Sequence, residues 1–373
     1  MPAIGLRFPR RVPVRLGSRS YNVRIDSGHL ERLSAEVRRL KLGTHPVVVS
    51  NPTILKSHAE TVAKELSRGG LPVQVLTIAD TERSKSMTTL ARLLTELADR
   101  DGPGRRLYLV LVGGGVVGDL GGLVAGLYRR GVPYVQVPTT LLAQVDSSLG
   151  GKTGVDLPQG KNLAGLFYQP RLVFIELDFL ETLSDRQFRS GLAEVAKCGV
   201  IRDPALFAFL ERTPFLLLRE SSDSIGWVVS RAVRVKAAVV EADEQETRGI
   251  RTLLNFGHTF GHALEAATHF TRVYTHGEAV AVGMLVATEI ARRLKVIPNG
   301  DADRIHRLLW HLELPTSVRG VTFAQLVKAM SHDKKWGVGR NCWVLPVKVG
   351  RAVVRRGVPD DIIRAAMRTV MEG

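Results

Sequence analysis

The sequence predicts an α/β fold: an N-terminal Rossmann-like domain with a mostly parallel sheet, followed by a mainly α-helical C-terminal domain. In the first half, short apolar runs alternate with helix-length segments, which is typical of a parallel sheet covered by helices on both faces. After about Leu183, long helical patterns dominate. A glycine-rich turn directly follows one of the apolar runs, as in nucleotide-binding α/β domains. We therefore expect two domains, 1–183 and 184–373.

The N-terminal domain begins with a predicted strand pair, because apolar and polar residues alternate between Val12 and Ile25. The segment is also rich in arginine and its first acid is Asp26, a composition shared with transit peptides. The alternation favours strands. Further strands are expected over residues 46–50, 73–78, 107–112 and 134–137, with helices over 54–69 and 86–99.

The C-terminal domain is predicted mainly from helical periodicity. Helices are expected over residues 187–200, 224–242, 259–267, 278–293 and 301–312. Strand patterns return only at residues 342–345 and 352–355.

The composition is that of a globular protein, with 45% hydrophobic and 24% charged residues. No stretch reaches the roughly 18 consecutive apolar residues that a membrane-spanning helix requires. The two cysteines, Cys198 and Cys342, provide neither a disulfide framework nor a CxxC metal spacing. A reducing, cytoplasmic location is therefore expected.

The formal net charge of +16 indicates an anionic partner. The sequence contains no zinc finger, no RNP-like aromatic strand and no long Lys/Arg block, so nucleic acid is disfavoured and a phosphorylated or carboxylated metabolite is favoured. Arginine far outnumbers lysine, which makes the retained lysines informative. Those in motif-like segments are Lys152, Lys161, Lys197, Lys236, Lys334 and Lys335.

The glycine-rich turn, Gly113 to Asp119, satisfies GxGxxG between a predicted strand and a predicted helix. Glycines there let the backbone approach a phosphate, and the helix N-terminus favours negative charge. The acid usually found about 20 residues further on is missing from residues 133–140. The turn is therefore either a nucleotide site of a different layout or a tight packing turn. The Gly-Lys-Thr at 151–153 is no P-loop, because Asp146 stands where glycine is required.

Histidines and a buried acid predict a metal site. His258 and His262 are four residues apart at a predicted helix start, which places them on one face. His276 begins another helix, and Glu194 is an acid on an otherwise apolar helix face. Two histidines and one carboxylate with open positions are typical of catalytic Zn²⁺. These residues alone do not decide which histidine binds the ion and which acts as a base.

With these motifs, the chain resembles the 3-dehydroquinate synthase family of sugar-phosphate cyclases from about Val12 to Arg355. The segments that carry the resemblance include GGGVVGDL at 113–120, VPTTLLAQVDSSLGGK at 137–152, RTLLNFGHTFGHALE at 251–265 and HGEAVAVGM at 276–284. The resemblance implies a two-domain homodimer with bound NAD⁺ and one divalent metal, Zn²⁺ or Co²⁺. It implies conversion of 3-deoxy-D-arabino-heptulosonate 7-phosphate to 3-dehydroquinate and phosphate in the shikimate pathway. The steps would be oxidation, phosphate elimination, re-reduction, ring opening and an intramolecular aldol addition.

The resemblance also implies roles for individual residues. The metal ligands would be Glu194, His258 and His276. Residues 1–183 would hold NAD⁺ through Ser50, Asn51, Glu82, Lys85, Gly114, Gly115, Val116, Val117, Asp119, Thr139, Thr140, Asp146, Ser147, Lys152, Lys161 and Thr182. The substrate would be surrounded by Lys152, Asn162, Lys197, Lys236, Arg251, Asn255, His262, Lys334 and Lys335. His262 would shuttle protons, and Arg130 would reach the phosphate bound by the neighbouring subunit.

Two departures and two alternatives accompany the resemblance. Ala79-Asp80-Thr81-Glu82 stands where the family usually shows Pro-x-Gly-Glu, although Glu82 and Lys85 remain, and Cys198 replaces a frequent aromatic residue. One alternative is another sugar-phosphate cyclase of secondary metabolism, which the synthase-like residues at the substrate positions disfavour. The other is a metal-dependent polyol dehydrogenase, which would release NADH.

Overall fold

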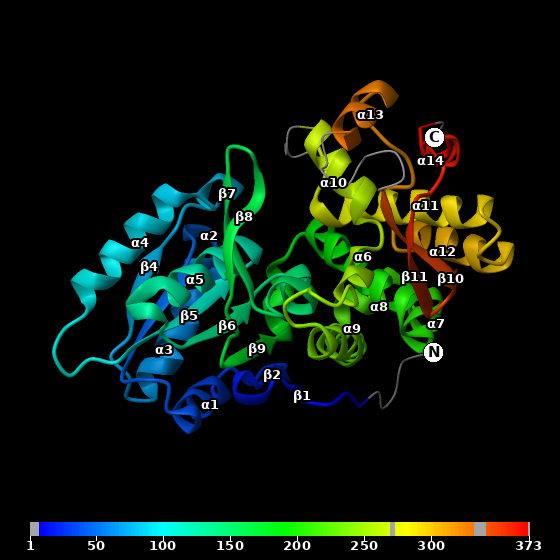
Figure 1. Ribbon diagram of the computed structural model, residues 1–373. Coiled ribbons are helices and arrows are strands. Elements are labelled where there is room, and N and C mark those ends of the chain that lie inside the picture. The colour runs from blue at the N-terminus through cyan, green and yellow to red at the C-terminus, as the bar shows by residue number, and fades with distance from the viewer. Residues whose placement is uncertain (1–6, 269–272, 332–340, 372–373) are drawn as a thin grey trace. The chain divides into compact units, whose positions relative to one another are not determined.

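The computed structural model describes residues 7–268, 273–331 and 341–371 (Figure 1). The chain divides into two compact units: unit 1 is Met1–Leu183 with Ser222–Glu241, and unit 2 is Ser184–Ser221 with Ala242–Gly373. The sequence predicts a single break near residue 183, whereas the structure returns helix α9 (Ser222–Ala242) to unit 1. Phe8 packs on Gly226 of this helix, and Glu241 accepts a hydrogen bond from the Arg15 backbone N–H at 2.7 Å.

Unit 1 is built on a seven-stranded sheet in the order β1-β2-β9-β6-β5-β3-β4. The strands are β1 (Arg11–Val14), β2 (Tyr21–Asp26), β3 (His45–Ser50), β4 (Gln74–Thr77), β5 (Leu107–Gly113), β6 (Tyr134–Pro138) and β9 (Leu172–Glu176). Only the β1–β2 pair is antiparallel. The predicted mostly parallel sheet is confirmed, and β5, β6 and β9 are buried along their whole length.

Helices cover both faces of this sheet (Figure 1). They are α1 (Arg32–Leu40), the short α2 (Pro52–Ile54), α3 (Glu60–Arg68), α4 (Met87–Arg100) and α5 (Gly115–Leu127). Val47 and Val49 pack with the core under α4 and α5, whereas Val48 between them packs with the core under α1 and α3. Alternate residues of a strand point to opposite faces, so a continuous apolar run builds both cores.

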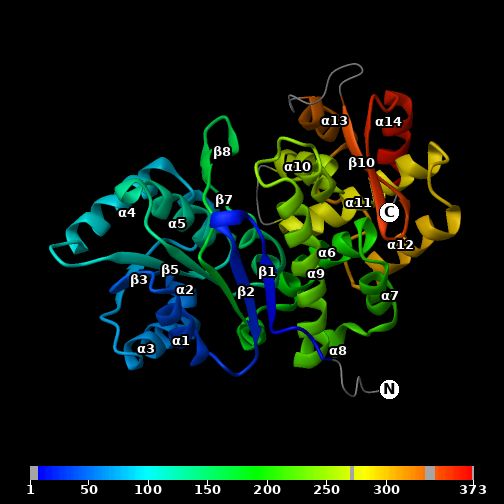
Figure 2. The same cartoon turned by 60° about the horizontal axis from the view of Figure 1, so that its bottom comes forward.

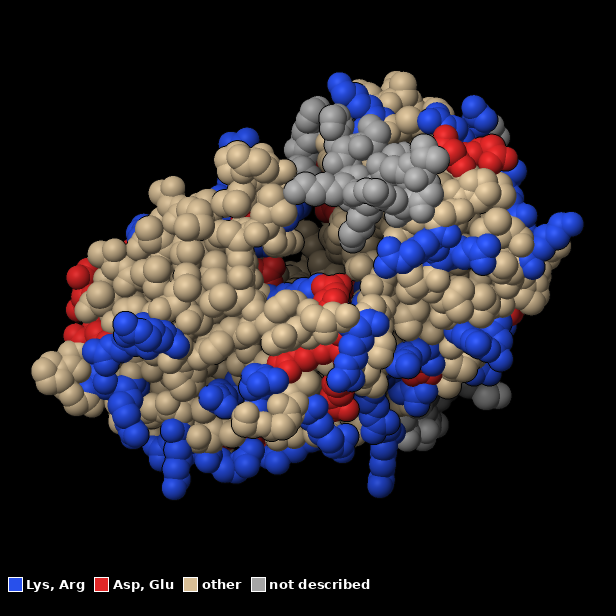
Figure 3. Space-filling view, in the orientation of Figure 1, with Lys and Arg blue, Asp and Glu red and all other residues tan. Residues whose placement is uncertain are grey.

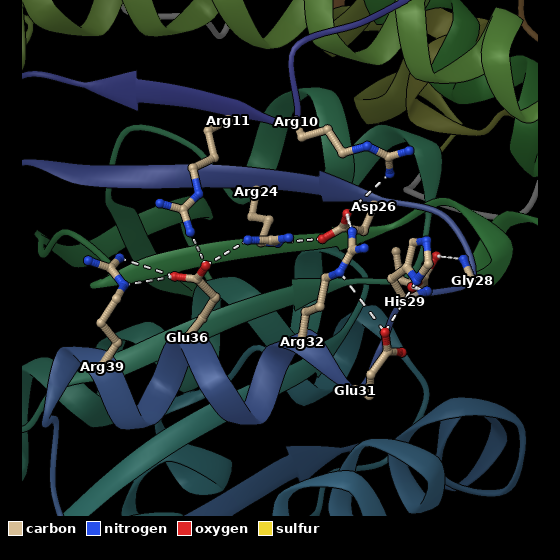
Figure 4. Close-up of polar contacts among 11 residues, drawn as sticks. Arg10, Arg11, Arg24, Asp26, Gly28, His29, Glu31, Arg32, Glu36 and Arg39 are labelled. Atoms are coloured by element: carbon tan, nitrogen blue, oxygen red, sulfur yellow. Dashed lines mark hydrogen bonds and ion pairs between the residues drawn. The ribbon is translucent and has the colours of Figure 1, made fainter.

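An ion-pair network fixes the N-terminal strand pair to α1 (Figure 4). The carboxylates of Asp26 and Glu36 are buried. Arg24 joins them, donating to both and reaching Glu36 Oε1 at 2.7 Å, while Arg32 and Arg10 donate to Asp26 Oδ1 at 2.8 and 3.2 Å. The arginine-rich segment thus folds as the predicted strands, and its charges pair with acids of the same unit.

Glu36 gives unit 1 an acid-sensitive element. Burial raises its pKa, but Arg39, Arg11 and Arg24 outweigh burial and hold the pKa below its ordinary value. Folded Glu36 therefore contributes stability above pH 4.5, and this stability is lost as the pH falls through the lowered folded pKa. Glu36→Gln should lower the free energy of unfolding at pH 7 by about 1–3 kcal/mol and flatten its decline on acidification. Urea titrations at pH 7 and pH 4 measure both effects, and Glu31→Gln, which changes an exposed acid, is the control. An equal decline of the free energy of unfolding between pH 7 and pH 4 in Glu36→Gln and the parent would contradict this account.

The positive charge of unit 1 is dispersed on the face that Figure 3 presents. Lys and Arg side chains are scattered along the lower edge of this unit, with Asp and Glu side chains among them. Nucleic-acid binders typically gather such charge into one patch or stripe. The distribution on this face therefore matches an arginine-rich composition.

Unit 2 is mainly helical. Its helices are α6 (Asp185–Ile201), α7 (Pro204–Arg212), α8 (Phe215–Glu220), α10 (His258–Ala267), α11 (His276–Arg293), α12 (Asn299–His311), α13 (Phe323–Ser331) and α14 (Asp360–Thr369). Helix α11 packs against α6, α10, α12 and α14, and against strand β10 (Cys342–Lys348), which pairs with β11 (Arg351–Arg356) (Figure 2). Within the described ranges, no helix combines the length and apolar character that crossing a membrane requires.

Candidate active site

Three side chains of unit 2 converge as a candidate metal centre. Glu194 comes from the middle of α6, His258 from the start of α10 and His276 from the start of α11. The Nε2 atoms of both histidines lie 3.8 Å from Glu194 Oε1. One ligand atom from each of the three residues lies within 4.8 Å of the others. The sequence-predicted ligand set is therefore brought together.

Glycines bring the three helices close enough for this convergence. A Cβ atom on Gly283 of α11 would overlap the carbonyl oxygen of Gly257, which precedes α10 with φ +81°. A Cβ on Gly277, at the start of α11, would overlap the backbone of Ser190 in α6. Only glycine permits these backbone contacts, so the two helix starts that carry His258 and His276 lie near Glu194.

The donor set fits a divalent metal. Glu194 is 1% exposed, and its Oε1 accepts no hydrogen bond from the described residues. Burial, and then the positive charge of Lys197, hold the pKa of His258 well below 6.5, so this imidazole is neutral with a free lone pair. Ligand atoms in a tetrahedral zinc site are about 3.3 Å apart, close to the spacing here. An ion would satisfy the buried carboxylate oxygen and both imidazoles.

Each imidazole also has a hydrogen-bond acceptor near Nδ1, the ring nitrogen that faces away from Glu194. His258 Nδ1 lies 3.2 Å from the Phe256 carbonyl oxygen, and His276 Nδ1 lies 3.4 Å from Glu265 Oε2. Donation from Nδ1 leaves Nε2 as the ligand atom. Glu265 was not among the sequence-predicted residues, although its spacing of seven from His258 and three from His262 places it on the same face of α10.

Two further predicted residues of unit 2, Lys197 and His262, lie next to this group. Lys197, also from α6, forms a buried ion pair with Glu194. The His262 ring centroid lies 5.3 Å from that of His258, and the His262 side chain is exposed. Arg251 and Asn255 bound the 3₁₀ helix η7 (Arg251–Asn255), where Arg251 Nη1 donates to the Glu244 carbonyl oxygen at 2.8 Å. Lys334 and Lys335 lie outside the described residues.

In unit 1, the glycine-rich turn joins β5 to α5. Gly114 is the N-cap of α5 and supplies no capping side chain. Side chains of Thr140 and Ser147 lie against Gly114 and Gly115. The buried Thr139 hydroxyl has no hydrogen-bond partner among the described residues. Free N–H groups at a helix start and an unsatisfied hydroxyl fit the phosphates of a dinucleotide.

Two lysines link other predicted residues of unit 1. Lys85, which is buried, donates to Asp119 Oδ2 at 2.9 Å and to Asn162 Oδ1 at 2.6 Å. Lys236 of α9 donates to the Asp146 carbonyl oxygen at 2.6 Å and pairs with its carboxylate. Asp146 and Ser147 lie in the π-helical turn η5 (Ala143–Ser147), a conformation that is frequent at functional sites.

The remaining predicted residues are more widely distributed. Val116 and Val117 are in the first turn of α5. Lys152 begins a hairpin formed by β7 (Lys152–Leu157) and β8 (Gly160–Phe167). The same hairpin carries Lys161, whose Nζ lies 3.4 Å from Glu82 Oε1. Ser50 is the last residue of β3, and Asn51 follows it as the N-cap of α2. The Thr182 hydroxyl is hydrogen-bonded to His58 Nε2 at 2.7 Å. Asn51 Nδ2 donates to Asp80 Oδ1 at 2.9 Å, so the unusual 79–82 loop touches one of these residues directly.

Arg130 lies on a strained turn. Arg129 and Arg130 have backbone φ angles of +49° and +63°, values that residues other than glycine rarely adopt. Arg129 pairs with Asp101 at 2.7 Å, whereas the Arg130 side chain is exposed. The turn directs Arg130 to the surface of unit 1.

Comparison with known proteins places this site in a family. The family models described as 3-dehydroquinate synthase N-terminal and C-terminal match residues 75–190 and 191–336. A 3-dehydroquinate synthase of Pelotomaculum thermopropionicum is 46% identical over 353 residues, which cover 94% of each chain.

Solved structures share the fold over nearly the whole chain. A 2-deoxy-scyllo-inosose synthase complexed with carbaglucose-6-phosphate, NAD⁺ and Co²⁺ has a TM-score of 0.85 and 25% identity, covering 97% of this chain and 100% of its own. The 2-epi-5-epi-valiolone synthase of Streptomyces hygroscopicus, with NAD⁺ and Zn²⁺ bound, has a TM-score of 0.82 and 28% identity, covering 94% and 96%. The fold, the family models and the sequence identity agree: this chain belongs to the 3-dehydroquinate synthase family.

Proposed function

We propose that the protein is a 3-dehydroquinate synthase, which converts 3-deoxy-D-arabino-heptulosonate 7-phosphate to 3-dehydroquinate and phosphate. The 46% identity to a 3-dehydroquinate synthase over 94% of the chain carries this proposal. The two solved cyclases that act in other reactions share only 25–28% identity. The difference favours the synthase over a cyclase of secondary metabolism.

NAD⁺ and Zn²⁺ or Co²⁺ are the proposed cofactors, in line with the ions and dinucleotide named for the two solved cyclases. When bound, NAD⁺ accepts and returns a hydride while the metal ion polarises the reacting oxygen of the substrate. Glu194, His258 and His276 would hold the metal. The turn at Gly114 and the uncapped start of α5 would hold the dinucleotide phosphates.

The chain's own cations would hold the substrate. A substrate with a carboxylate and a phosphate needs several positive partners, and Arg can grip either group with two hydrogen bonds. We assign this binding to the cations Lys152, Lys197, Lys236, Arg251, Lys334 and Lys335, with the neutral amides of Asn162 and Asn255 as further hydrogen-bonding partners. The exposed His262 ring, 6.2 Å from that of His276, is the proposed proton shuttle because histidine titrates near neutral pH.

We further propose a homodimer in which Arg130 serves the partner's substrate. The hairpin of β7 and β8 exposes Leu163, Leu166 and Phe167, and the last residue of α5, Leu127, is also exposed. Leu166 lies against Gly126, one turn before Arg130. Exposed apolar side chains on a hairpin favour association because burying them removes apolar surface from water, and we propose that a second copy of the chain buries them.

Leu163→Asp should convert the dimer to monomers at micromolar concentration, because a charge would be buried in an apolar contact. Leu163 is 59% exposed, so the single chain tolerates the change. Light scattering during gel filtration measures the mass. The matched control is Leu216→Asp on α8, where the leucine is 61% exposed and distant in sequence. An unchanged dimer mass for Leu163→Asp would remove the hairpin from the interface.

The location proposed for this reaction is the cytoplasm. Cys198 and Cys342 form no disulfide, which is the usual state of thiols in a reducing compartment.

The decisive experiment measures phosphate released from 3-deoxy-D-arabino-heptulosonate 7-phosphate with NAD⁺ and Zn²⁺, with and without chelator, while absorbance at 340 nm is followed. Metal-dependent release without accumulation of NADH would support the synthase. Accumulating NADH would indicate a polyol dehydrogenase. No release from folded, metal-loaded protein would refute the proposal, and sedoheptulose 7-phosphate and glucose 6-phosphate would then be tested.

A further inference from the structure

We infer that Glu265 is a positioning residue of the metal centre: its carboxylate accepts the Nδ1–H of His276 and thereby turns Nε2 toward Glu194. The inference rests on the proposed metal role of Glu194, His258 and His276. Glu265 Oε2 lies 3.4 Å from His276 Nδ1, and Glu194 Oε1 lies 3.8 Å from His276 Nε2. The two carboxylates therefore lie at opposite nitrogens of the same ring.

This arrangement selects the tautomer that can bind an ion. A neutral imidazole carries one N–H, and the other nitrogen keeps the lone pair that a metal needs. A carboxylate oxygen can only accept, so Glu265 favours the proton on Nδ1 and the lone pair on Nε2. Because the acceptor is a negatively charged carboxylate, the hydrogen bond also makes Nε2, the ligand nitrogen, more basic.

The comparison with His258 shows what Glu265 adds. His258 is oriented by the Phe256 carbonyl oxygen at 3.2 Å, a main-chain atom only two residues away. His276 is the first residue of α11 and takes its acceptor from another helix, α10. Glu265 thus links the positions of the two histidine-bearing helices, and unlike a carbonyl oxygen it can be removed by mutation.

The burial of Glu265 agrees with such a role. Its residue is only 9% exposed, although acids are seldom buried without a specific partner. The side chain reaches His276 across the contact between α10 and α11, a pair of helices that packs closely.

A second ion is the competing explanation. His262, Glu265 and His276 also offer ligand atoms within 4.8 Å of one another. Such an ion, together with the first, would require His276 to bind through both nitrogens and so to lose its last ring proton. A hydrogen bond needs no such loss, and for this reason we favour positioning. The two explanations differ in the number of ions bound per chain.

The test compares metal binding by the full-length parent, Glu265→Ala and Glu265→Gln. Competition with a chromophoric chelator should show a loss of Zn²⁺ affinity of about 10–100-fold for Glu265→Ala. Glu265→Gln should lose less, because an amide oxygen still accepts the Nδ1–H but carries no charge. The visible absorption of the Co²⁺-loaded protein should change in the alanine variant, since the ring orientation changes.

Stability measurements separate positioning from a merely structural role. The apparent melting temperature without metal should be similar in Glu265→Ala and the parent, whereas its rise on adding Zn²⁺ should be smaller in the variant. Glu289→Gln, which removes a partly buried α11 acid paired with Arg292 and Arg293, should show the same rise in melting temperature on adding Zn²⁺ as the parent. Equal falls in melting temperature with and without metal would overturn the inference.

Two further outcomes would also overturn it: parental affinity and Co²⁺ spectrum in Glu265→Ala, or two ions per chain in the parent and one in the variant. Because no substrate is needed, the result is independent of the reaction. A parent that binds one ion in a Glu265-dependent way but releases no phosphate would refute the proposed function and leave this inference standing.

Discussion

Glu194→Gln is expected to reduce Zn²⁺ affinity strongly. The loss should exceed the about 10–100-fold that follows when a residue hydrogen-bonded to a metal ligand is removed. The substitution keeps the size of the side chain but replaces a charged ligand oxygen with a neutral amide. Glu194 Oε1 is the buried atom that both Nε2 atoms face at 3.8 Å. Chelator competition measures the affinity, and metal-dependent phosphate release should be lost in parallel. Parental affinity in this variant would place the metal elsewhere.

A loss of folding must be separated from a loss of binding in this experiment. Glu194 forms a buried ion pair with Lys197, and removing one charge of such a pair commonly costs about 3–5 kcal/mol. The double variant Glu194→Gln, Lys197→Met removes both charges and should recover much of the stability, because replacing a buried pair with an apolar side chain is often neutral. Metal binding should stay weak in the double variant if Glu194 is a ligand.

Gly283→Ala is expected to destabilise unit 2 and weaken metal binding together. Its Cβ would overlap the Gly257 carbonyl oxygen, a backbone atom that cannot rotate away. The starts of α10 and α11 would have to separate, which should cost at least about 1–3 kcal/mol of overpacking strain and misplace His258 relative to His276. The melting temperature of the metal-free protein and the affinity for Zn²⁺ should both fall.

The matched control for this variant is Gly300→Ala. Gly300 lies in the first turn of α12, and a Cβ there would meet no atom within 4 Å. Alanine should be neutral or stabilise α12 by up to about 1 kcal/mol, because glycine is the weaker helix former. If Gly283→Ala behaved like Gly300→Ala, close approach of α10 and α11 would not be what forms the metal centre.

The sequence predicts the parallel sheet well because its strands carry their own signal. The continuous apolar run at 107–112 became the fully buried β5. The hairpin of β7 and β8 was not predicted, since residues 152–167 mix glycine, lysine, asparagine and proline with isolated apolar residues. Its strands are set by pairing with each other and by packing of β7 on α5, which a single segment does not reveal.

The partner of a helix is equally hidden from a periodic pattern. The predicted helix over 224–242 exists as α9, yet its apolar face packs in unit 1 while its neighbours in sequence belong to unit 2. An apolar stripe shows that a face is buried, not what buries it. The spacing of the histidines indicated a metal site, but only the family resemblance singled out Glu194, His258 and His276 as its ligands. Glu265 was missed even though its spacing from His262 carries the same helical signal.

The strand order of unit 1 has a consequence for protein synthesis. Strand β2 pairs with β1 and β9 only, so it cannot join the sheet until residue 172 has left the ribosome. At 5–20 residues per second, that is a wait of roughly 7–30 s after residue 26. The arginine and carboxylate network within residues 10–39 is local and can hold the strand pair on α1 meanwhile. Completing unit 1 takes longer still, because α9 emerges only after the first helices of unit 2. A nascent chain stalled at residue 183 would therefore display an unfinished sheet domain, a natural client for chaperones that cover exposed apolar surface.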